Sequence, residues 1–378
     1  MTLVSPDYLT KDKLGMLRSL LRDKVLVKLF AVSLVIKLLS INEAWVERYY
    51  STGIYRHLAA FLRLITGWVP FSVGDLVYAG AFVYLVVKTW KYLKILKSRT
   101  VKDYLFHVLV SKLLRLVLSI YLVFNIAWGL NYNRQGIAAQ LHLDVQPYSL
   151  EDLEMVNKVL VQRLNRAAAT VDTGMRKPLE RNVNLFKEAL ATYKIVEQHH
   201  PFLKYRHLSV KTSFFSRVGH YFGFTGYYNP FTGEAQIKST APVFIKPFVV
   251  THEMAHQLGY AKESEANLVA FLSCRRSKHP EFVYSIYYDM FYYSIRELHR
   301  RDSLSAKSLT ENLHPQVKKD NEALAAYFKQ LANPVEPYVA AFYDEFLKLN
   351  NQPKGVKTYN EVVAFLIAYQ KRYGLQAI

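Results

Sequence analysis

The chain of 378 residues carries 49 Lys and Arg against 30 Asp and Glu, a formal net charge of +19, and 51% of its residues are hydrophobic. A single cysteine, Cys274, excludes an intrachain disulfide, a cysteine zinc cluster and an iron–sulfur centre, so any metal must be bound by His, Asp or Glu. No zinc-finger, RNA-recognition or basic-leucine-zipper pattern accompanies the positive charge, and we expect no nucleic-acid partner.

Three apolar segments, residues 25–41, 73–91 and 113–131, predict membrane-spanning helices. Each approaches the length that a hydrocarbon core of roughly 30 Å requires. Segment 25–41 is the weakest, because Lys37 must reach the interface or face another helix. A cleaved signal peptide is the alternative for this segment, but no small-residue cleavage site follows it. A buried bundle in a soluble protein is the alternative for all three, and the aromatic and basic residues that flank them favour the membrane.

Basic residues are distributed unevenly between the predicted loops. Residues 1–24 and 92–112 are rich in Lys and Arg, whereas residues 42–72 contain three arginines and two glutamates. Because short basic loops stay in the cytoplasm, residues 1–24 are predicted to be a cytoplasmic basic arm. Residues 25–131 then form a three-span membrane region, and residues 132–378 an extracytoplasmic domain. The predicted location is the inner (cytoplasmic) membrane, with the lipid bilayer as a partner.

The first part of the outer domain combines amphipathic helices with short strands. Helical periodicity predicts helices over residues 150–171 and 184–198. Alternating apolar residues predict strands over 207–215 and 234–238, and a turn at 229–233 precedes the second strand. We therefore expect one small sheet upstream of residue 249.

The segment VVTHEMAHQLG contains the residues with the clearest chemistry. Pro247 suits the first turn of a helix, and Gly259 suits the position just after its end. His252 and His256 stand one turn apart on the same face of that helix, so both imidazoles can reach one ion. Glu253 lies beside them, where a carboxylate can take a proton from a metal-bound water. This is the H-E-x-x-H pattern of zinc peptidases.

A catalytic zinc ion takes three protein ligands and leaves one position for water. The third histidine of the metzincin pattern would fall at Lys262, so that pattern is excluded. Glu263 begins a second predicted helix and is the predicted third ligand, while Glu265 points elsewhere on it and is less favoured. Asn267 shares a face with Glu263 and is predicted to hydrogen-bond a ligand histidine. The alternative is a polar helix without a metal.

Further helices are predicted downstream of this segment, over residues 281–300, 319–331, 335–349 and 358–372. The predicted fold is therefore mainly α, with three N-terminal transmembrane helices followed by an α+β zinc hydrolase domain with a small sheet.

The two-histidine motif with a glutamate on a later helix resembles the gluzincin metallopeptidases. Membrane-embedded gluzincins carry E-x-x-A-D on the second helix, matched here by Glu263, Ala266 and, with Asn in place of Asp, Asn267. The resemblance implies Zn²⁺ as cofactor, Glu253 as general base, and an upstream edge strand, here within 233–238, that holds a peptide. It also implies a Tyr or His that stabilises the oxyanion, for which the candidates are His220, Tyr227, Tyr228 and Tyr359.

Segments across nearly the whole chain, among them NYNRQG and GYYNPFTGEAQI, are similar to an uncharacterised bacterial membrane family of unknown function. This similarity supplies no substrate. The expected function is a membrane-anchored zinc metallopeptidase that hydrolyses a peptide or protein substrate. Two alternatives remain open: a non-catalytic membrane sensor or assembly factor that retains a metal site, and a zinc amidase that acts on cell-wall peptides.

Overall fold

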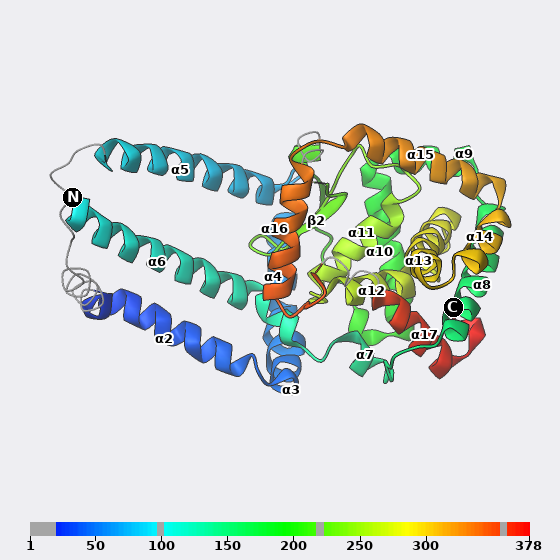
Figure 1. Ribbon diagram of the computed structural model, residues 1–378, viewed down its shortest axis with the longest axis horizontal. Coiled ribbons are helices and arrows are strands. Elements are labelled where there is room, and N and C mark those ends of the chain that lie inside the picture. The colour runs from blue at the N-terminus through cyan, green and yellow to red at the C-terminus, as the bar shows by residue number, and fades with distance from the viewer. Residues whose placement is uncertain (1–19, 97–101, 217–222, 356–360) are drawn as a thin grey trace, which may run out of the picture.

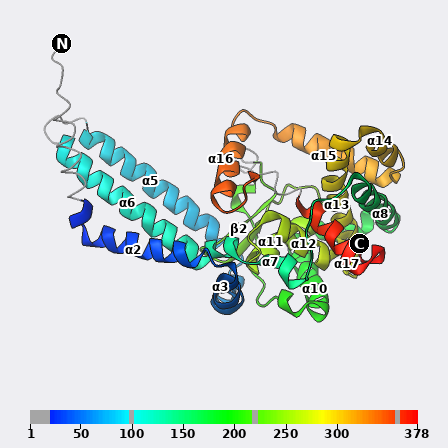
Figure 2. The same cartoon turned by 60° about the horizontal axis from the view of Figure 1, so that its bottom comes forward.

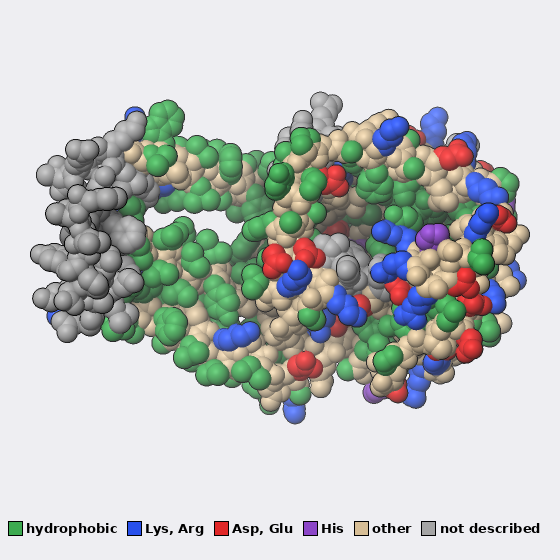
Figure 3. Space-filling model, in the orientation of Figure 1, with side chains coloured by type: hydrophobic (Ala, Val, Ile, Leu, Met, Phe, Trp, Pro, Cys, Tyr) green, Lys and Arg blue, Asp and Glu red, His purple; other side chains and the backbone are tan. Residues whose placement is uncertain are grey.

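Three long helices project from one side of a helical body (Figure 1). The computed structural model describes residues 20–96, 102–216, 223–355 and 361–378. The long helices are α2 (Lys24–Leu39), α5 (Val73–Leu96) and α6 (Lys102–Ala127). Hydrophobic side chains cover much of their surface (Figure 3). Exposure of this kind along whole helices is typical of contact with lipid.

Two of the three predicted spans are long and apolar enough to cross a membrane. They cover Val73–Lys91 in α5 and Leu109–Ala127 in α6. The third predicted span, 113–131, extends too far, because the chain leaves the helix at Trp128 and forms the 3-10 helix η3 (Gly129–Asn133) inside the body. The first span is not established: α2 has only 16 residues. It reaches spanning length only together with the helical segment Glu43–Gly67, which is bent away by 96°.

The segment between the first two predicted spans, expected to be an outer loop, is helical and packs onto the body. It consists of α3 (Glu43–Trp45), the π-helix η1 (Val46–Tyr55) and α4 (Arg56–Gly67). Tyr55 and Ala59 are buried. The Arg63 guanidinium is also buried and donates from Nη1 to the Gln257 carbonyl at 2.8 Å and from Nε to the Arg206 carbonyl at 2.9 Å. Polar contacts therefore fix this segment to the body.

The predicted helices of the body are present, with additional short ones. They are α7 (Gly136–Gln140), α8 (Leu150–Ala168), α9 (Thr173–Glu180), α10 (Asn182–His199), α11 (Lys246–Gln257), α12 (Glu263–Cys274), α13 (Pro280–Arg301), α14 (Ser303–Glu311), α15 (Pro315–Leu331), α16 (Glu336–Leu349) and α17 (Val362–Tyr373). Every residue of α11 and α12 is buried. The H-E-x-x-H helix therefore lies at the centre of the body and not on its surface.

Local sequence signals explain where α8 and α11 begin and end. Ser149 and Asp152 form a reciprocal capping box at the start of α8, with both hydrogen bonds at 3.1 Å. Pro247 occupies the first turn of α11. Gly259 follows the end of α11 with a φ of 87°, a left-handed conformation that favours glycine over residues with a side chain.

The small sheet has the strand order β1-β3-β2. Strand β1 (Val210–Thr212) pairs in parallel with β3 (Glu234–Ile237), and β2 (Gly226–Asn229) pairs with β3 in antiparallel register. The expected edge strand within 233–238 is therefore the central strand, which corrects that prediction. Strand β2, which ends at Asn229 where the turn begins, lies at one edge of the sheet.

Strand β3 also holds the start of α5. The buried Glu234 carboxylate accepts hydrogen bonds from the backbone N–H groups of Val73 at 3.1 Å and Gly74 at 2.5 Å, and from the Thr232 hydroxyl at 2.9 Å. The first N–H groups of a helix have no partner within the helix, and a carboxylate there also favours the helix dipole. The candidate span α5 is thus fixed at its base by the sheet.

Replacement of Glu234 by Ala is expected to leave the two N–H groups at the start of α5 without their acceptor. The expected cost is about 1–3 kcal/mol of folding free energy, which would appear as a lower thermal unfolding midpoint of the detergent-solubilised protein. Glu322→Ala, at an exposed position on α15, is the matched control. An unchanged midpoint for Glu234→Ala would contradict this role.

Candidate metal centre

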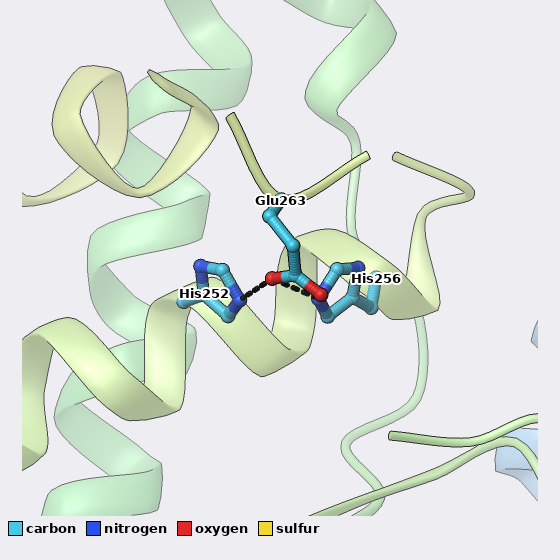
Figure 4. A group of neighbouring side chains, drawn as sticks. All are labelled: His252, His256 and Glu263. Carbon is cyan, nitrogen blue, oxygen red and sulfur yellow. Dashed lines mark hydrogen bonds and ion pairs between the residues drawn. The ribbon is translucent and has the colours of Figure 1, made fainter. Parts of the chain in front are cut away.

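Three predicted ligands meet between α11 and the start of α12 (Figure 4). Oε2 of Glu263 lies 3.1 Å from Nε2 of His252 and 3.5 Å from Nε2 of His256. One ligand atom from each residue lies within 4.8 Å of the other two. All three side chains are buried. Among the described residues this is the group of His, Cys, Asp and Glu side chains that could hold a metal ion.

The hydrogen bond at Nδ1 of His256 determines which ring nitrogen faces Glu263. Nδ1 lies 2.7 Å from the carbonyl oxygen of Tyr260, and a carbonyl only accepts, so Nδ1 carries a hydrogen. The other ring nitrogen, Nε2, therefore faces the Glu263 carboxylate. Because an unprotonated Nε2 and a carboxylate oxygen both present lone pairs, a positive charge is needed between them. The carboxylate raises the pKa of His256 to about 9 although burial acts to lower it. A divalent cation meets the same requirement.

The chemistry of this donor set fits zinc. Two imidazole nitrogens and one carboxylate oxygen are ligands of catalytic zinc sites, in which the fourth position is open to water. Burial acts to raise the pKa of Glu263, but the two imidazoles outweigh it and hold that pKa well below its ordinary value. Glu263 therefore favours its anionic form, which a metal ligand requires.

Two residues that sequence analysis did not identify hold Glu263 in place. The Tyr343 hydroxyl of α16 donates to Oε1 of Glu263 at 2.8 Å. This contact leaves Oε2 directed at the histidines. The Gln352 side-chain oxygen accepts from the Glu263 backbone N–H at 3.1 Å. Neither position carries a local sequence signal, because the partners lie 80 and 89 residues away along the chain.

Asn267 lies where it was expected, beside His252. Burial lowers the pKa of His252, and the hydrogen bonds that its ring donates to the Glu263 and Asn267 side chains oppose this effect. The amide of Asn267 therefore contacts one ligand histidine, while the Tyr260 carbonyl contacts the other. Such contacts orient metal ligands and adjust their basicity.

Glu253 is buried beside the three ligands without belonging to their group. Its Oε2 atom has no hydrogen-bond partner among the described residues. Burial raises the pKa of this carboxyl to about 8, against the opposing effect of His256. The backbone of β2 passes next to it: a Cβ atom added at Gly226 would lie 2.9 Å from Oε1 of Glu253 and 2.7 Å from a methyl carbon of Val249.

Glu265 points away from the ligands, towards the start of α7. Its Oε1 atom occupies the space where a side chain at Gly136 would be, since a Cβ atom there would lie 1.9 Å away. The nearest cation is the Lys262 ammonium, with Nζ at 3.9 Å. The geometry therefore favours Glu263 over Glu265 as the third ligand.

Two of the four residues expected to stabilise the oxyanion, Tyr227 and Tyr228, are among the described residues. The Tyr227 hydroxyl donates to the buried Asp75 at the start of α5, so its proton is already used. The Tyr228 hydroxyl shares a hydrogen bond with the Tyr55 hydroxyl at 3.3 Å. His220 and Tyr359 lie outside the described residues.

The end of α11 is capped by side chains from segments that precede it by more than a hundred residues. The last carbonyls of a helix have no partner within the helix. The donors are Trp128 Nε1 to the His256 carbonyl at 3.1 Å, the Tyr55 hydroxyl and Arg63 Nη1 to the Gln257 carbonyl at 3.2 and 2.8 Å, and Arg134 Nη1 to the Gly259 carbonyl at 3.1 Å. Trp128 directly follows α6, so the candidate span is joined to the ligand helix.

Fold and site define a mainly helical protein with two apolar helices that could span a membrane and a buried His and Glu group that could bind a metal. The chain belongs to the family described as "Protein of unknown function (DUF3810)", which matches residues 50–367. No curated protein and no solved structure matches the chain. The match includes all residues of the candidate centre, so the function is argued from their chemistry.

Replacement of Glu263 by Ala is expected to abolish zinc retention, because it removes the one anionic ligand. Glu265→Ala removes a carboxylate from the same helix that does not face the histidines, and it should retain about one zinc per chain. Zinc content of the purified proteins measured by mass spectrometry distinguishes the two. Equal zinc content in both variants would contradict the ligand assignment.

Replacement of Trp128 by Phe keeps an aromatic ring against His256 but removes a donor to the His256 carbonyl. The His256 carbonyl keeps the Gly259 N–H at 3.0 Å and loses one of its donors, so stability should fall by the net value of one hydrogen bond, about 0.5–1.5 kcal/mol. Trp90→Phe, at an exposed position on α5, is the control. Thermal unfolding of both variants in the same detergent tests this, and an identical midpoint would argue against the capping role.

Proposed function

We propose that the protein is a membrane-anchored, zinc-dependent metallopeptidase of the gluzincin type. The observation that carries the proposal is Glu253, a buried carboxylate that adjoins the ligands, is not one of them, and has an oxygen atom without a hydrogen-bond partner among the described residues. A purely structural zinc site has a closed set of ligands and needs no general base. Glu253 therefore favours a hydrolase over a metal site retained for folding or ligand capture.

The residues of the site have separate roles in this proposal. His252, His256 and Glu263 would hold the metal, which when bound supplies a water of lowered pKa and polarises the substrate carbonyl. Glu253 would favour its ionised form against the effect of burial once these three residues hold a cation. Its carboxylate then accepts a proton from the attacking water and returns it to the leaving nitrogen. Tyr343, bonded to Oε1 of Glu263, keeps the ligand oxygen directed at the metal position.

Strand β2 is the proposed binding edge for an extended peptide. It pairs with β3 on one side, and no other described strand pairs with its second side. The backbone at Gly226 lies against Glu253, so a peptide added as a further strand would pass the general base. Peptide recognition by strand addition uses backbone hydrogen bonds of this kind. The absence of a side chain at Gly226 keeps this approach open.

The distribution of charge supports a body outside the cytoplasm. Lys88, Lys91 and Lys94 lie at the end of α5 that is remote from the body (Figure 1). Basic residues next to a span remain on the cytoplasmic side. The proposed location is therefore the inner membrane of a bacterium, with the metal centre on the outer side.

Replacement of Glu253 by Gln is expected to retain zinc and fold while lowering kcat by at least about 100-fold, because the amide cannot accept the proton. Glu265→Gln is the matched control and should retain activity. The assay measures release of new amino termini from a panel of peptides that includes peptidoglycan fragments, which separates a peptidase from a cell-wall amidase. Wild-type hydrolysis that persists undiminished in Glu253→Gln would exclude this base.

A further inference from the structure

Two helices at the base of the long helices expose large apolar side chains to the outside. One is the segment formed by η1 and α4, and the other is α16. Neither is long enough and apolar enough by itself to be a candidate span. Both nevertheless present an apolar stripe that no described residue covers, and a soluble protein rarely exposes such contiguous surfaces.

The stripe on α4 is formed by Phe61, Leu64, Ile65 and Trp68, whose spacing places them on one helix face. All four are exposed, and Trp68 is 78% exposed. The opposite face, with Ala59, Arg63 and Thr66, is buried against the body. Helix α4 is therefore amphipathic, with its polar contacts directed inward and its apolar face directed outward.

The direction of α4 differs from that of the long helices. The segment Glu43–Gly67 is bent by 96° from α2. If α2 follows the membrane normal, α4 runs parallel to the membrane surface. It cannot be drawn into the bilayer as a continuation of α2, because Arg63 is bonded to the Gln257 and Arg206 carbonyls of the body.

The second stripe is on α16. Tyr338, Phe342 and Leu349 lie on one face, and Phe342 is 75% exposed. Leu347 is the one buried residue of this helix. The Phe346 ring packs edge-on against Phe124 of α6 at a centroid distance of 6.2 Å. Since Phe124 belongs to the candidate span Leu109–Ala127, α16 lies at the level where this span ends.

The two helices occupy the same level of the molecule from different parts of the chain. In Figure 1 both α16 and the segment that begins at α3 run across the direction of α2, α5 and α6 where these meet the body. In Figure 2 both again lie on the side of the body that faces the long helices. Trp68 precedes the start of the α5 span, Val73, by only a few residues.

We propose that the η1–α4 segment and α16 lie in the membrane interface, with their apolar stripes in the lipid and their axes in its plane. Amphipathic helices with this composition bind at the boundary between headgroups and acyl chains, and Trp68 is of the residue type enriched there. The occupant of both stripes is the bilayer and not a second copy of the chain. The η1–α4 segment adjoins the start of the candidate span in α5, and α16 packs against the candidate span in α6.

This arrangement seats the candidate metal centre at the membrane surface. Arg63 of α4 is bonded to the last residue of α11, and Tyr343 of α16 is bonded to Glu263. Each interfacial helix therefore contacts one of the two helices that carry the metal ligands. A substrate would reach the site along the bilayer surface. The docking itself does not depend on hydrolysis and can be tested without it.

The test uses the full chain reconstituted in phosphatidylcholine and phosphatidylglycerol vesicles, with an environment-sensitive nitrobenzoxadiazole label at one introduced cysteine. The native Cys274 is buried and should not be labelled. The probe positions are Phe61→Cys and Phe342→Cys. The control is Leu304→Cys on α14, which is 80% exposed and remote from the long helices (Figure 1).

We expect blue-shifted emission at positions 61 and 342, and quenching by lipids brominated on the acyl chain, with neither effect at position 304. Emission typical of water at 61 and 342 would overturn the proposal. A blue shift without quenching by brominated lipid would also overturn it, since the stripes would then be covered by protein. Loss of hydrolysis or of zinc in other variants leaves this measurement unaffected, so failure of the two proposals can be distinguished.

Discussion

Side chains next to the candidate spans donate hydrogen bonds to the end of α11, and these bonds hold the candidate metal centre in position. This helix carries His252 and His256, and its final carbonyls are buried inside the protein. Trp128 and Arg63 satisfy two of them. Because buried carbonyls without partners are costly, the Gln257 carbonyl requires α4 packed against the end of α11. The end of α6 adds a second donor to the His256 carbonyl, which also accepts from the Gly259 N–H.

A second constraint comes from charge buried between α11 and α12. The Glu263 carboxylate is removed from water, and the free-energy cost of this desolvation is offset only by opposite charge and hydrogen bonds. Its two oxygens are divided between different partners: Oε1 accepts from Tyr343, and Oε2 faces the histidines. Glu253 lies close by and has no such compensation. This difference in surroundings fits the proposed roles, with Glu263 as a metal ligand and Glu253 as the general base.

Sequence analysis predicted the parts of the centre that depend on short separations. His252 and His256 are one helical turn apart. Glu263 follows after the turn at Gly259, at the start of the next helix. Helical periodicity and capping signals therefore locate all three residues. Tyr343, Gln352 and Trp128 contact the same centre from separations of 80 residues or more. Contacts between residues that far apart along the chain produce no periodic pattern in a single sequence.

Two of the errors in the fold illustrate their physical causes. Residues 42–72 were assigned to a loop because they connect two predicted spans, although Phe61, Leu64 and Trp68 have helical spacing. Strand β3 was expected at an edge open to a peptide, because its place before the two-histidine helix corresponds to that of the edge strand in the gluzincins. Glu234 is instead fully buried, and its partners are the N–H groups at the start of α5, which lie 160 residues earlier.

Side chains that precede residue 132, in the part of the chain with the candidate spans, cap the end of α11. That part of the chain is therefore not an independent module. A fragment that begins at residue 132 would contain every predicted ligand and the proposed general base, yet it would lack Tyr55, Arg63 and Trp128, which donate to the His256 and Gln257 carbonyls. Exchange of the anchor for an unrelated span would have the same effect. Evolutionary changes in the segments that cap α11 are therefore coupled to changes in α11 itself.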